Sequence, residues 1–356
     1  MKRIVGLLAA AVCLAQAAEK IAGGPMVVNL KGRSATVVWV VEQGSAKLGT
    51  TPGAIDKSAP ALEVRQTSFS GLAPGKTYYY DVDGSDAGKG SFKTPPSGAE
   101  PFEFVVFGDT RTRHEVHRRV IASILKYSEP EFVLHSGDLV SDGYDSAQWP
   151  VFFDIERELL RKIAFYPALG NHERNNRQFY DFFQVGTPYY SFDWGTAHFI
   201  VLNSDLGNAA STPSAKEAFW QAQKTWFEED LKASQKASYR FVIAHHPPMT
   251  AVSRRQAGNP EMAALLPLFD KYKVTAGFFG HDHNYQHYLK DGIHYVVSGG
   301  GGAPLYDVAN PPAGITVKAT SVEHFCRIRM NGDTAKVAAI GVDGAVLDEF
   351  ELHASK

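Results

Sequence analysis

The stretch Phe132–Asp138, which reads Phe-Val-Leu-His-Ser-Gly-Asp, decides the class of fold expected for this chain. A short apolar run that ends in glycine is typical of a buried strand. Proteins of the α/β class place their ligands at the carboxyl ends of such strands. Asp138 is therefore expected to point into a site, although aspartate is also common in ordinary turns. Other strands with the same ending distinguish these two interpretations.

Four further apolar runs of the chain also end in Asp, Asn or His. They are Phe102–Phe107 before Gly108-Asp109, Ile163–Leu169 before Gly170-Asn171-His172-Glu173, Tyr239–Ala244 before His245-His246, and Val274–Phe279 before Gly280-His281-Asp282-His283. A single ending of this kind carries little weight. Together the endings supply only oxygen and imidazole ligands, which suit metal ions. The sequence therefore predicts a shared metal site.

In this order the endings resemble the motifs of calcineurin-like metallophosphoesterases, and more narrowly those of the purple acid phosphatase branch. The family's motifs are an Asp after a strand, Gly-Asp, Gly-Asn-His-Glu or Gly-Asn-His-Asp, a lone His after a strand, and Gly-His-x-His. All of them occur within residues 108–283. The resemblance implies a four-layer α/β domain, with two β-sheets flanked by helices. The alternating pattern of the sequence by itself indicates only a layered α/β domain.

The resemblance also implies a dinuclear centre of divalent or mixed-valence iron, manganese or zinc ions. Asp138 matches the carboxylate that bridges the two ions. The other ligands implied are Asn171, His245 and His281 for one ion, and Asp109 and His283 for the other. A bridging anion is chemically sensible because it offsets the repulsion between two neighbouring cations.

The activity implied is that of a metal-dependent phosphoric ester hydrolase acting on phosphate monoesters by attack of a metal-bound hydroxide. His172 matches the acid that protonates the leaving alkoxide, a role that suits imidazole. One alternative is a phosphodiesterase acting on nucleotides or lipid head groups. Another is a non-catalytic surface-binding protein with a structural metal site. His172 argues against the last alternative, because a structural site needs no additional proton donor.

The match fails at two ligand positions. Purple acid phosphatases have Tyr three residues after the bridging Asp, where this chain has Ser141, and we therefore predict a colourless protein. Other metallophosphoesterases have His two residues after the first Asp, where this chain has Arg111. One metal thus lacks a ligand. His117, three residues after His114 on the next predicted helix, is our choice to replace it; the alternative is that water completes the coordination.

Two residues beside the predicted ligands are candidates for substrate binding. Arg111 could hold a phosphate oxygen through its planar donors or pair with a carboxylate such as Asp142. His246 follows a predicted ligand, and adjacent strand residues point to opposite sides. His246 is therefore expected to face the substrate or to support a ligand.

Composition gives no sign of a nucleic-acid or membrane partner, and it leaves a nucleotide substrate open. The 356 residues contain 36 basic and 38 acidic side chains, so no strongly basic face for nucleic acid or membranes is indicated. No run approaches the ~20 apolar residues of a membrane span. The partner expected is a small phosphoester, and the oligomeric state stays open.

The predicted organisation has three parts. Residues 1–17 resemble a signal peptide, with Lys2-Arg3 before an apolar stretch and an Ala-Gln-Ala ending, so export to the periplasm or medium is expected. A lipoprotein anchor at Cys13 is an alternative with a poor recognition sequence. Residues 18–96 form a fibronectin type III-like module, because Gly71–Tyr80 resembles a turn of that fold. Residues 97–356 form the metallophosphoesterase domain, with helices predicted at Glu115–Tyr127, Ala147–Lys162, Arg177–Phe183, Ser214–Ala233 and Pro260–Tyr272.

Overall fold

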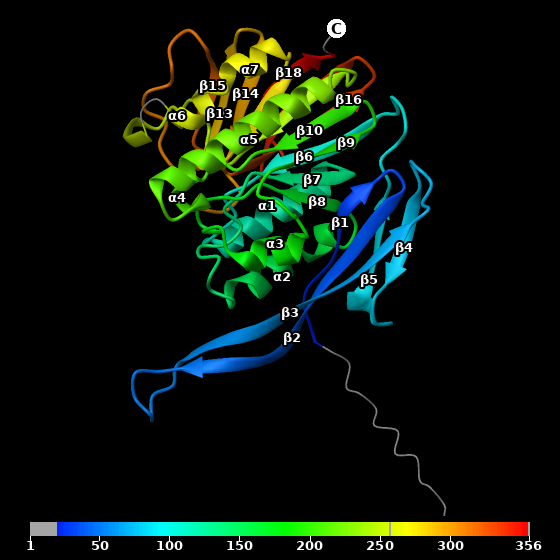
Figure 1. The fold of residues 1–356 in the computed structure, drawn as a ribbon, viewed down its shortest axis with the longest axis vertical. Helices are drawn as coiled ribbons and strands as arrows, with labels where there is room; N and C mark the ends of the chain where they lie inside the picture. The colour runs from blue at the N-terminus through cyan, green and yellow to red at the C-terminus, as the bar shows by residue number, and fades with distance from the viewer. Residues whose placement is uncertain (1–19, 256–257, 355–356) are drawn as a thin grey trace, which may run out of the picture.

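Two β-sheets form the body of the protein, and the first of them has six strands in the order β18-β17-β16-β6-β7-β8 (Figure 1). The computed structural model describes residues 20–255 and 258–354, so the predicted signal segment lies outside the described residues. Three neighbouring strands run parallel: β6 (Phe102–Phe107), β7 (Phe132–His135) and β8 (Ala164–Pro167). Three antiparallel strands complete this sheet: β16 (His324–Asn331), β17 (Thr334–Gly341) and β18 (Val346–His353).

The second sheet has seven strands in the order β15-β13-β14-β12-β11-β10-β9. Its strands are β9 (Tyr190–Trp194), β10 (Ala197–Val201), β11 (Tyr239–Ile243), β12 (Ala276–Phe279), β13 (Tyr285–Lys290), β14 (Ile293–Ser298) and β15 (Thr316–Thr320). Strands β10, β11 and β12 are parallel neighbours. Asp291 and Gly292 join β13 to β14 with φ of 53° and 78°. Positive φ at both positions is what a tight hairpin turn requires, and only small or flexible residues adopt it readily.

Aromatic side chains fill the space between the two sheets. The rings of Phe104 and Phe132 meet the ring of Phe199 nearly edge-on, with both pairs of centroids 5.2 Å apart. Phe241 packs against Phe104 in the same way. Because side chains alternate along a strand, these residues face inward while their neighbours Val105 and Val242 face the outer helices. The two-sheet α/β architecture implied by the resemblance is confirmed.

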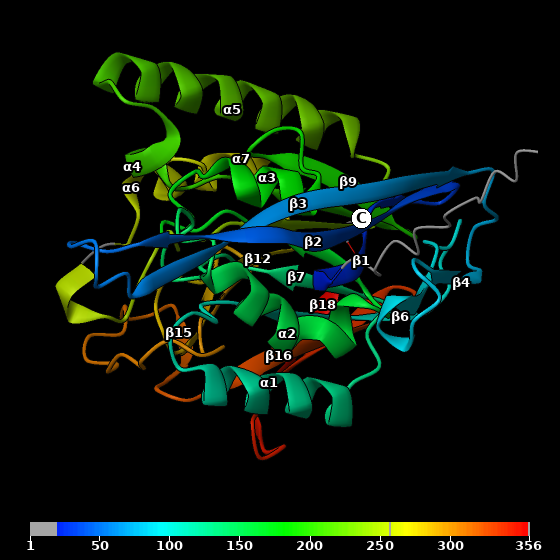
Figure 2. The ribbon, with the colours of Figure 1, turned by 90° about the horizontal axis from the view of Figure 1, so that it is seen from below.

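Helices cover the outer faces of both sheets (Figure 2). Helices α1 (His114–Tyr127) and α2 (Gln148–Leu160) lie on the six-stranded side, and α5 (Pro213–Ala233) and α7 (Leu266–Lys271) on the other. Helix α5 begins at Pro213 because the Thr212 side chain accepts a hydrogen bond from Ala215 N. The remaining short helices are α3 (Arg177–Phe183), α4 (Leu206–Ala209), α6 (Pro260–Ala263) and the 3-10 turns η1 (Asp86–Gly88) and η2 (Ser253–Arg255).

The amino-terminal region is built of β-strands, as predicted, with the 3-10 turn η1 between β4 and β5. Strands β1 (Ile21–Lys31), β2 (Ser34–Leu48) and β3 (Lys57–Ser70) form one sheet, and β4 (Thr77–Asp81) pairs with β5 (Lys89–Lys93). The outer halves of β2 and β3 extend from the body as a long arm (Figure 1). Strand β1 packs on α2, and Met26 and Val38 belong to the same apolar core as Phe104. The boundary predicted at residue 96 stays a prediction.

Local structure differs from the sequence prediction in two places. The helix predicted over Pro260–Tyr272 is divided into α6 and α7, because Pro267 has no N–H to continue the hydrogen bonding of α6. The strand pair β9 and β10 had no predicted counterpart. Among the described residues, no helix is long and apolar enough to cross a membrane.

Candidate metal centre

The loops that follow β6, β7, β8, β11 and β12 carry the predicted ligands. In a parallel sheet the carboxyl ends of the strands meet at one edge, and here the edges of both sheets contribute. Ligand atoms of Asp109, Asp138 and His283 lie within 4.8 Å of one another. The ligand atoms of three histidines, His245, His246 and His281, also lie within 4.8 Å of one another. Two candidate metal groups therefore lie among the described residues.

Left-handed backbone conformations aim three of the predicted ligands into this centre. Asp109, Asp138 and His281 have φ of 57°, 58° and 67°. Such conformations cost roughly 1–3 kcal/mol each and persist where the surrounding structure holds them. Gly170 shows how tightly the loops meet, because a Cβ there would lie 2.3 Å from both N and Oδ1 of Asp138. Only glycine fits at that position.

The first ligand group consists of Asp138, Asn171, His245 and His281. His245 Nε2 lies 3.2 Å from Asn171 Oδ1, 3.4 Å from Asp138 Oδ1 and 3.2 Å from His281 Nδ1. His245 Nδ1 donates to the carbonyl of Ser136 at 2.8 Å, so in the neutral ring Nε2 presents a lone pair to these atoms. Such a set fits a cation, and a backbone partner on the far nitrogen is typical of metal-binding histidines.

The charges around His245 show how strongly the centre favours a positive charge. Burial lowers the pKa of His245, but the carboxylates of Asp138 and Asp109 outweigh it and raise the pKa to about 9. In the absence of a metal ion the ring thus carries a proton that neutralises the neighbouring carboxylate. For His281, burial and the nearby His245 lower the pKa far below its usual range, so this ring is neutral, as metal binding through a ring nitrogen requires.

The second ligand group consists of Asp109, Asp138 and His283. Asp109 Oδ1 is buried and has no hydrogen-bond partner among the described residues, and it lies 3.4 Å from His283 Nε2. His283 Nδ1 donates to the carbonyl of Pro304 at 2.7 Å, which leaves a lone pair on Nε2. An orphaned buried carboxylate oxygen facing an imidazole lone pair also fits a cation.

Arg111 lies inside the second group. Its Nε donates to Asp138 Oδ2 at 3.3 Å, and its Nη2 donates to His283 Nε2 at 3.4 Å. The side chain is only 14% exposed. Of the two predicted alternatives, phosphate binding stays a prediction, and the predicted pairing with a carboxylate is made with Asp138 and not with Asp142, which accepts from Arg174.

His172 lies at the open side of the centre with 30% of its side chain exposed. Its Nδ1 donates to the carbonyl of Ser141 at 2.7 Å, and its Nε2 lies 3.8 Å from Asp138 Oδ2. The backbone N of His172 donates to Asp138 Oδ1 at 3.0 Å. The ring is therefore fixed at one nitrogen and presents the other to the centre.

The structure does not bring His117 to the centre. Its Nε2 lies 2.7 Å from Glu156 Oε1, and both side chains are buried between α1 and α2. Phe152 packs against the same ring. His117 is thus held by a carboxylate on a neighbouring helix and belongs to neither ligand group.

His246 lies beside His245 instead of facing away from it. Strand β11 ends at Ile243, so the alternation expected of a strand does not apply to these two residues. The ring centroids of His246 and His281 are 4.1 Å apart. Ser204 Oγ accepts from His246 N at 2.8 Å and lies 2.9 Å from His246 Nδ1. With this hydroxyl donating to Nδ1, Nε2 carries the proton and is a donor.

Glu173 organises the centre, a role that sequence reasoning missed. Its Oε2 accepts from the backbone N of Asp138 at 2.9 Å and of Gly170 at 2.8 Å. Its Oε1 accepts from Leu139 N at 2.7 Å and Val140 N at 3.3 Å. Burial and the Asp138 carboxylate raise the pKa of Glu173 to about 7. The only signal in the sequence was its place in Gly-Asn-His-Glu.

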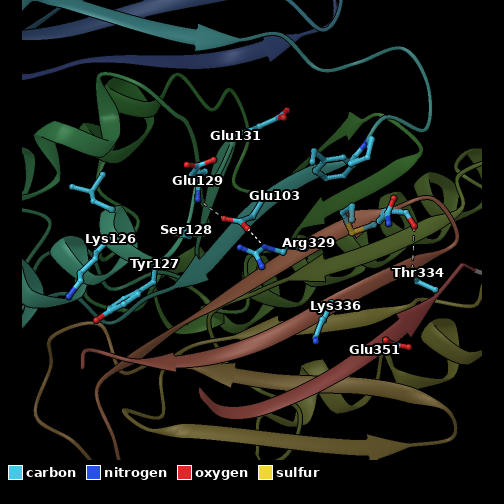
Figure 3. Close-up of a pocket in the computed structure, with 15 residues that line it drawn as sticks. Glu103, Lys126, Tyr127, Ser128, Glu129, Glu131, Arg329, Thr334, Lys336 and Glu351 are labelled. Carbon is cyan, nitrogen blue, oxygen red and sulfur yellow. Dashed lines mark hydrogen bonds and ion pairs between the residues drawn. The ribbon is translucent and has the colours of Figure 1, made fainter. Parts of the chain in front are cut away.

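Surface hollows differ in their relation to the centre. A pocket of about 240 Å³ borders His246 and His281. A wider hollow of about 960 Å³ lies along β6, β16 and β18, where Arg329 donates to Glu103 at 2.6 Å (Figure 3). None of the predicted site residues lines the wider hollow. The smaller pocket is therefore the better candidate for substrate.

Residues 102–285, just over half of the chain, match the sequence model of the calcineurin-like phosphoesterases, and the chain belongs to that family. It is 27% identical over 274 residues to an uncharacterized protein of Mycobacterium tuberculosis, covering 65% of this chain and 51% of that protein. It is 28% identical over 247 residues to purple acid phosphatase 21 of Arabidopsis thaliana, covering 64% and 53%. The chain thus spans about half the length of these relatives.

The fold is also similar to that of a solved purple acid phosphatase from yellow lupin seeds. The TM-score is 0.72, and the match covers 92% of this chain and 74% of the lupin chain. Sequence identity in this comparison is 18%, so the likeness concerns the fold. It includes the amino-terminal β region as well as the α/β body.

Proposed function

We propose that this protein is a metal-dependent phosphoesterase that hydrolyses phosphate monoesters. The observation that carries the proposal is His172, whose Nε2 faces Asp138 while Nδ1 is fixed on the Ser141 carbonyl. A site that only stabilised the fold would not need a partly exposed imidazole that belongs to neither ligand group. Family membership supports the same reaction class.

The first ligand group, made of Asp138, Asn171, His245 and His281, would hold one metal ion. The resemblance to the family's dinuclear centre implies another ion at the second group, where Arg111 also lies. A bound divalent ion polarises a phosphoryl oxygen and lowers the pKa of water. The protein's own residues supply the other functions. Protonated His172 would donate from Nε2 to the leaving alkoxide as the ester P–O bond breaks. His246 Nε2–H would bind a phosphoryl oxygen in the adjoining pocket.

The test is hydrolysis of a chromogenic phosphate monoester and of the corresponding diester by protein loaded with manganese, zinc or iron. We expect the monoester to be the better substrate. The variant His172→Ala should lose ~100-fold or more of kcat while keeping its metal content and Tm. His353→Ala removes an exposed histidine of β18 and is the matched control.

The outcomes separate the alternatives. Preference for the diester would replace the monoesterase proposal with the phosphodiesterase alternative. No turnover of either ester with any of the metals would refute the enzyme and favour the surface-binding alternative.

We also propose export, which is supported by the sequence of residues 1–17 alone. Mass spectrometry of the protein produced in a secreting bacterium should find a mature chain that begins after Ala17. An uncleaved chain retained in the cytoplasm would contradict export.

A further inference from the structure

We propose that the guanidinium of Arg111 takes the place of the second metal ion, so that each chain binds one metal ion. The inference rests on the proposed function, and it concerns the occupancy of the same centre. It starts from the inequality of the two ligand groups. The first has four protein residues, with atoms of Asp138, Asn171 and His281 each 3.2–3.4 Å from His245 Nε2. The second has only Asp109, Asp138 and His283, with Arg111 among them.

Arg111 uses the same atoms that a second metal would need. Its Nε–H points to Asp138 Oδ2 and its Nη2–H to His283 Nε2, at 3.3 Å and 3.4 Å. A guanidinium can only donate, so His283 must present a lone pair to it. That lone pair is the one that would bind a metal ion at about 2.0–2.1 Å. The arginine and a second ion therefore compete for one position.

The loop that carries Arg111 is fixed from both sides. Arg111 N donates to the Asp138 carbonyl at 3.3 Å, and Thr110 Oγ1 lies 3.2 Å from His135 Nε2. The next arginine, Arg113, donates to the carbonyls of Gly302 at 2.9 Å and Ala303 at 2.7 Å. Arg111 is consequently a half-buried part of the centre, held by its own loop, and differs from a freely exposed surface side chain.

The charge balance of the centre also favours one metal ion in the first ligand group and Arg111 in the second. Asp109 and Asp138 are both buried, so two negative charges need nearby compensation. A divalent ion in the first group and the guanidinium in the second supply it together. A second divalent ion beside Arg111 would instead repel a cation that is only 14% exposed.

The arginine keeps a donor for substrate. Arg111 Nη1 has no hydrogen-bond partner among the described residues, whereas Nε and Nη2 are used within the centre. A planar guanidinium suits phosphate oxygens, which it can bind without metal coordination. Arg111 would thus supply, as a fixed cation, the phosphate-binding function that a second ion supplies elsewhere.

No neighbouring residue completes the second group. The sequence predicted His117 as the replacement, but its Nε2 is hydrogen-bonded to Glu156 Oε1 in a buried pair. Among the described residues, the only candidate groups of three or more His, Cys, Asp or Glu that include the predicted ligands are the two already described. The second ligand group therefore has three protein ligands, and the Arg111 guanidinium already contacts two of them, Asp138 and His283.

The experiment is a count of bound metal. Protein is equilibrated with zinc or manganese, dialysed, and its metal content per chain is measured by mass spectrometry. We expect about one ion in the wild type and about two in Arg111→His, which removes the cation and adds an imidazole ligand. Arg118→His, an exposed arginine of α1 paired with Asp154, is the matched control and should bind one.

Electron paramagnetic resonance of the manganese-loaded proteins gives a second measure. The wild type should show the spectrum of isolated ions, and Arg111→His that of a coupled pair. Two ions in the wild type would overturn the role of Arg111 while leaving the proposed function intact. No ion in the wild type would refute the proposed function itself. One ion in a folded Arg111→His would also overturn the inference, and if this variant does not fold, the wild-type count decides.

Discussion

Glu173 provides the sharpest test of how the centre is held, because one carboxylate satisfies four buried backbone N–H groups. The substitution Glu173→Gln keeps the size of the side chain and replaces one oxygen by an amide. Whichever oxygen is lost, two N–H groups then face another donor: either those of Asp138 and Gly170, or those of Leu139 and Val140. Each unsatisfied buried group costs ~1–3 kcal/mol. We expect a loss of about 4 kcal/mol in the free energy of unfolding.

Urea denaturation followed by far-UV circular dichroism measures this loss. The experiment is best done at pH 8, because the pKa of Glu173 is raised to about 7 and the side chain must be ionised in the wild type. With an m value of ~3 kcal/mol/M, the midpoint should fall by roughly 1 M. Glu229→Gln, on the exposed side of α5, is the control and should change nothing. A loss below ~1 kcal/mol in Glu173→Gln would refute this account of the centre.

Two further predictions concern the pH dependence of stability and the visible absorption of the iron-loaded protein. His198 contacts Asp193 at 2.6 Å and Asp230 at 2.8 Å, and although burial lowers its pKa, these carboxylates raise it to about 9. Because the folded pKa exceeds the unfolded value near ~6.5, the stabilisation is complete below that pH and lost as pH rises through 9. Urea unfolding should show His198→Gln less stable by about 3 kcal/mol at pH 6 and equal to wild type at pH 10. Iron-loaded protein should have no visible charge-transfer band, since Ser141 replaces the tyrosine ligand; a purple sample would contradict this.

Much of the fold was readable because strand ends and helix ends carry local signals. The apolar runs before Gly108, Gly137 and Gly280 each form a buried parallel strand, and the helix predicted at Arg177–Phe183 has the predicted bounds. The pair β9 and β10 was overlooked in the prediction. Tyr190, Phe192 and Trp194 alternate with Ser191 and Asp193 in β9, which is a strand pattern, but β9 has only five residues and pairs with β10 alone, at the sheet edge.

The candidate site was readable in its residue types but only partly in its geometry. Ligand motifs follow from chemistry, whereas the direction of each side chain follows from backbone turns and tertiary contacts. His117 has suitable chemistry and spacing, yet Glu156, 39 residues away in the sequence, holds its ring between two helices. His246 turns toward the centre because the strand ends before it. Arg111 was singled out from its place two residues after Asp109, whereas its position between Asp138 and His283 required the structure.

The left-handed conformations of Asp109, Asp138 and His281 explain why these loops must support one another. Their combined strain is several kcal/mol at ~1–3 kcal/mol each. Within the protein this strain is offset by hydrogen bonds between the loops. Asp109 N donates to the Gly137 carbonyl at 2.9 Å, and Asp138 N donates to Glu173 Oε2. His281 N donates to Asp109 Oδ2 at 2.9 Å. Each strained residue is thus anchored by the loop of another strand. The ligand positions are set by the folded chain, so metal binding does not have to build the loops, and a change such as Glu173→Gln should weaken the centre as a unit.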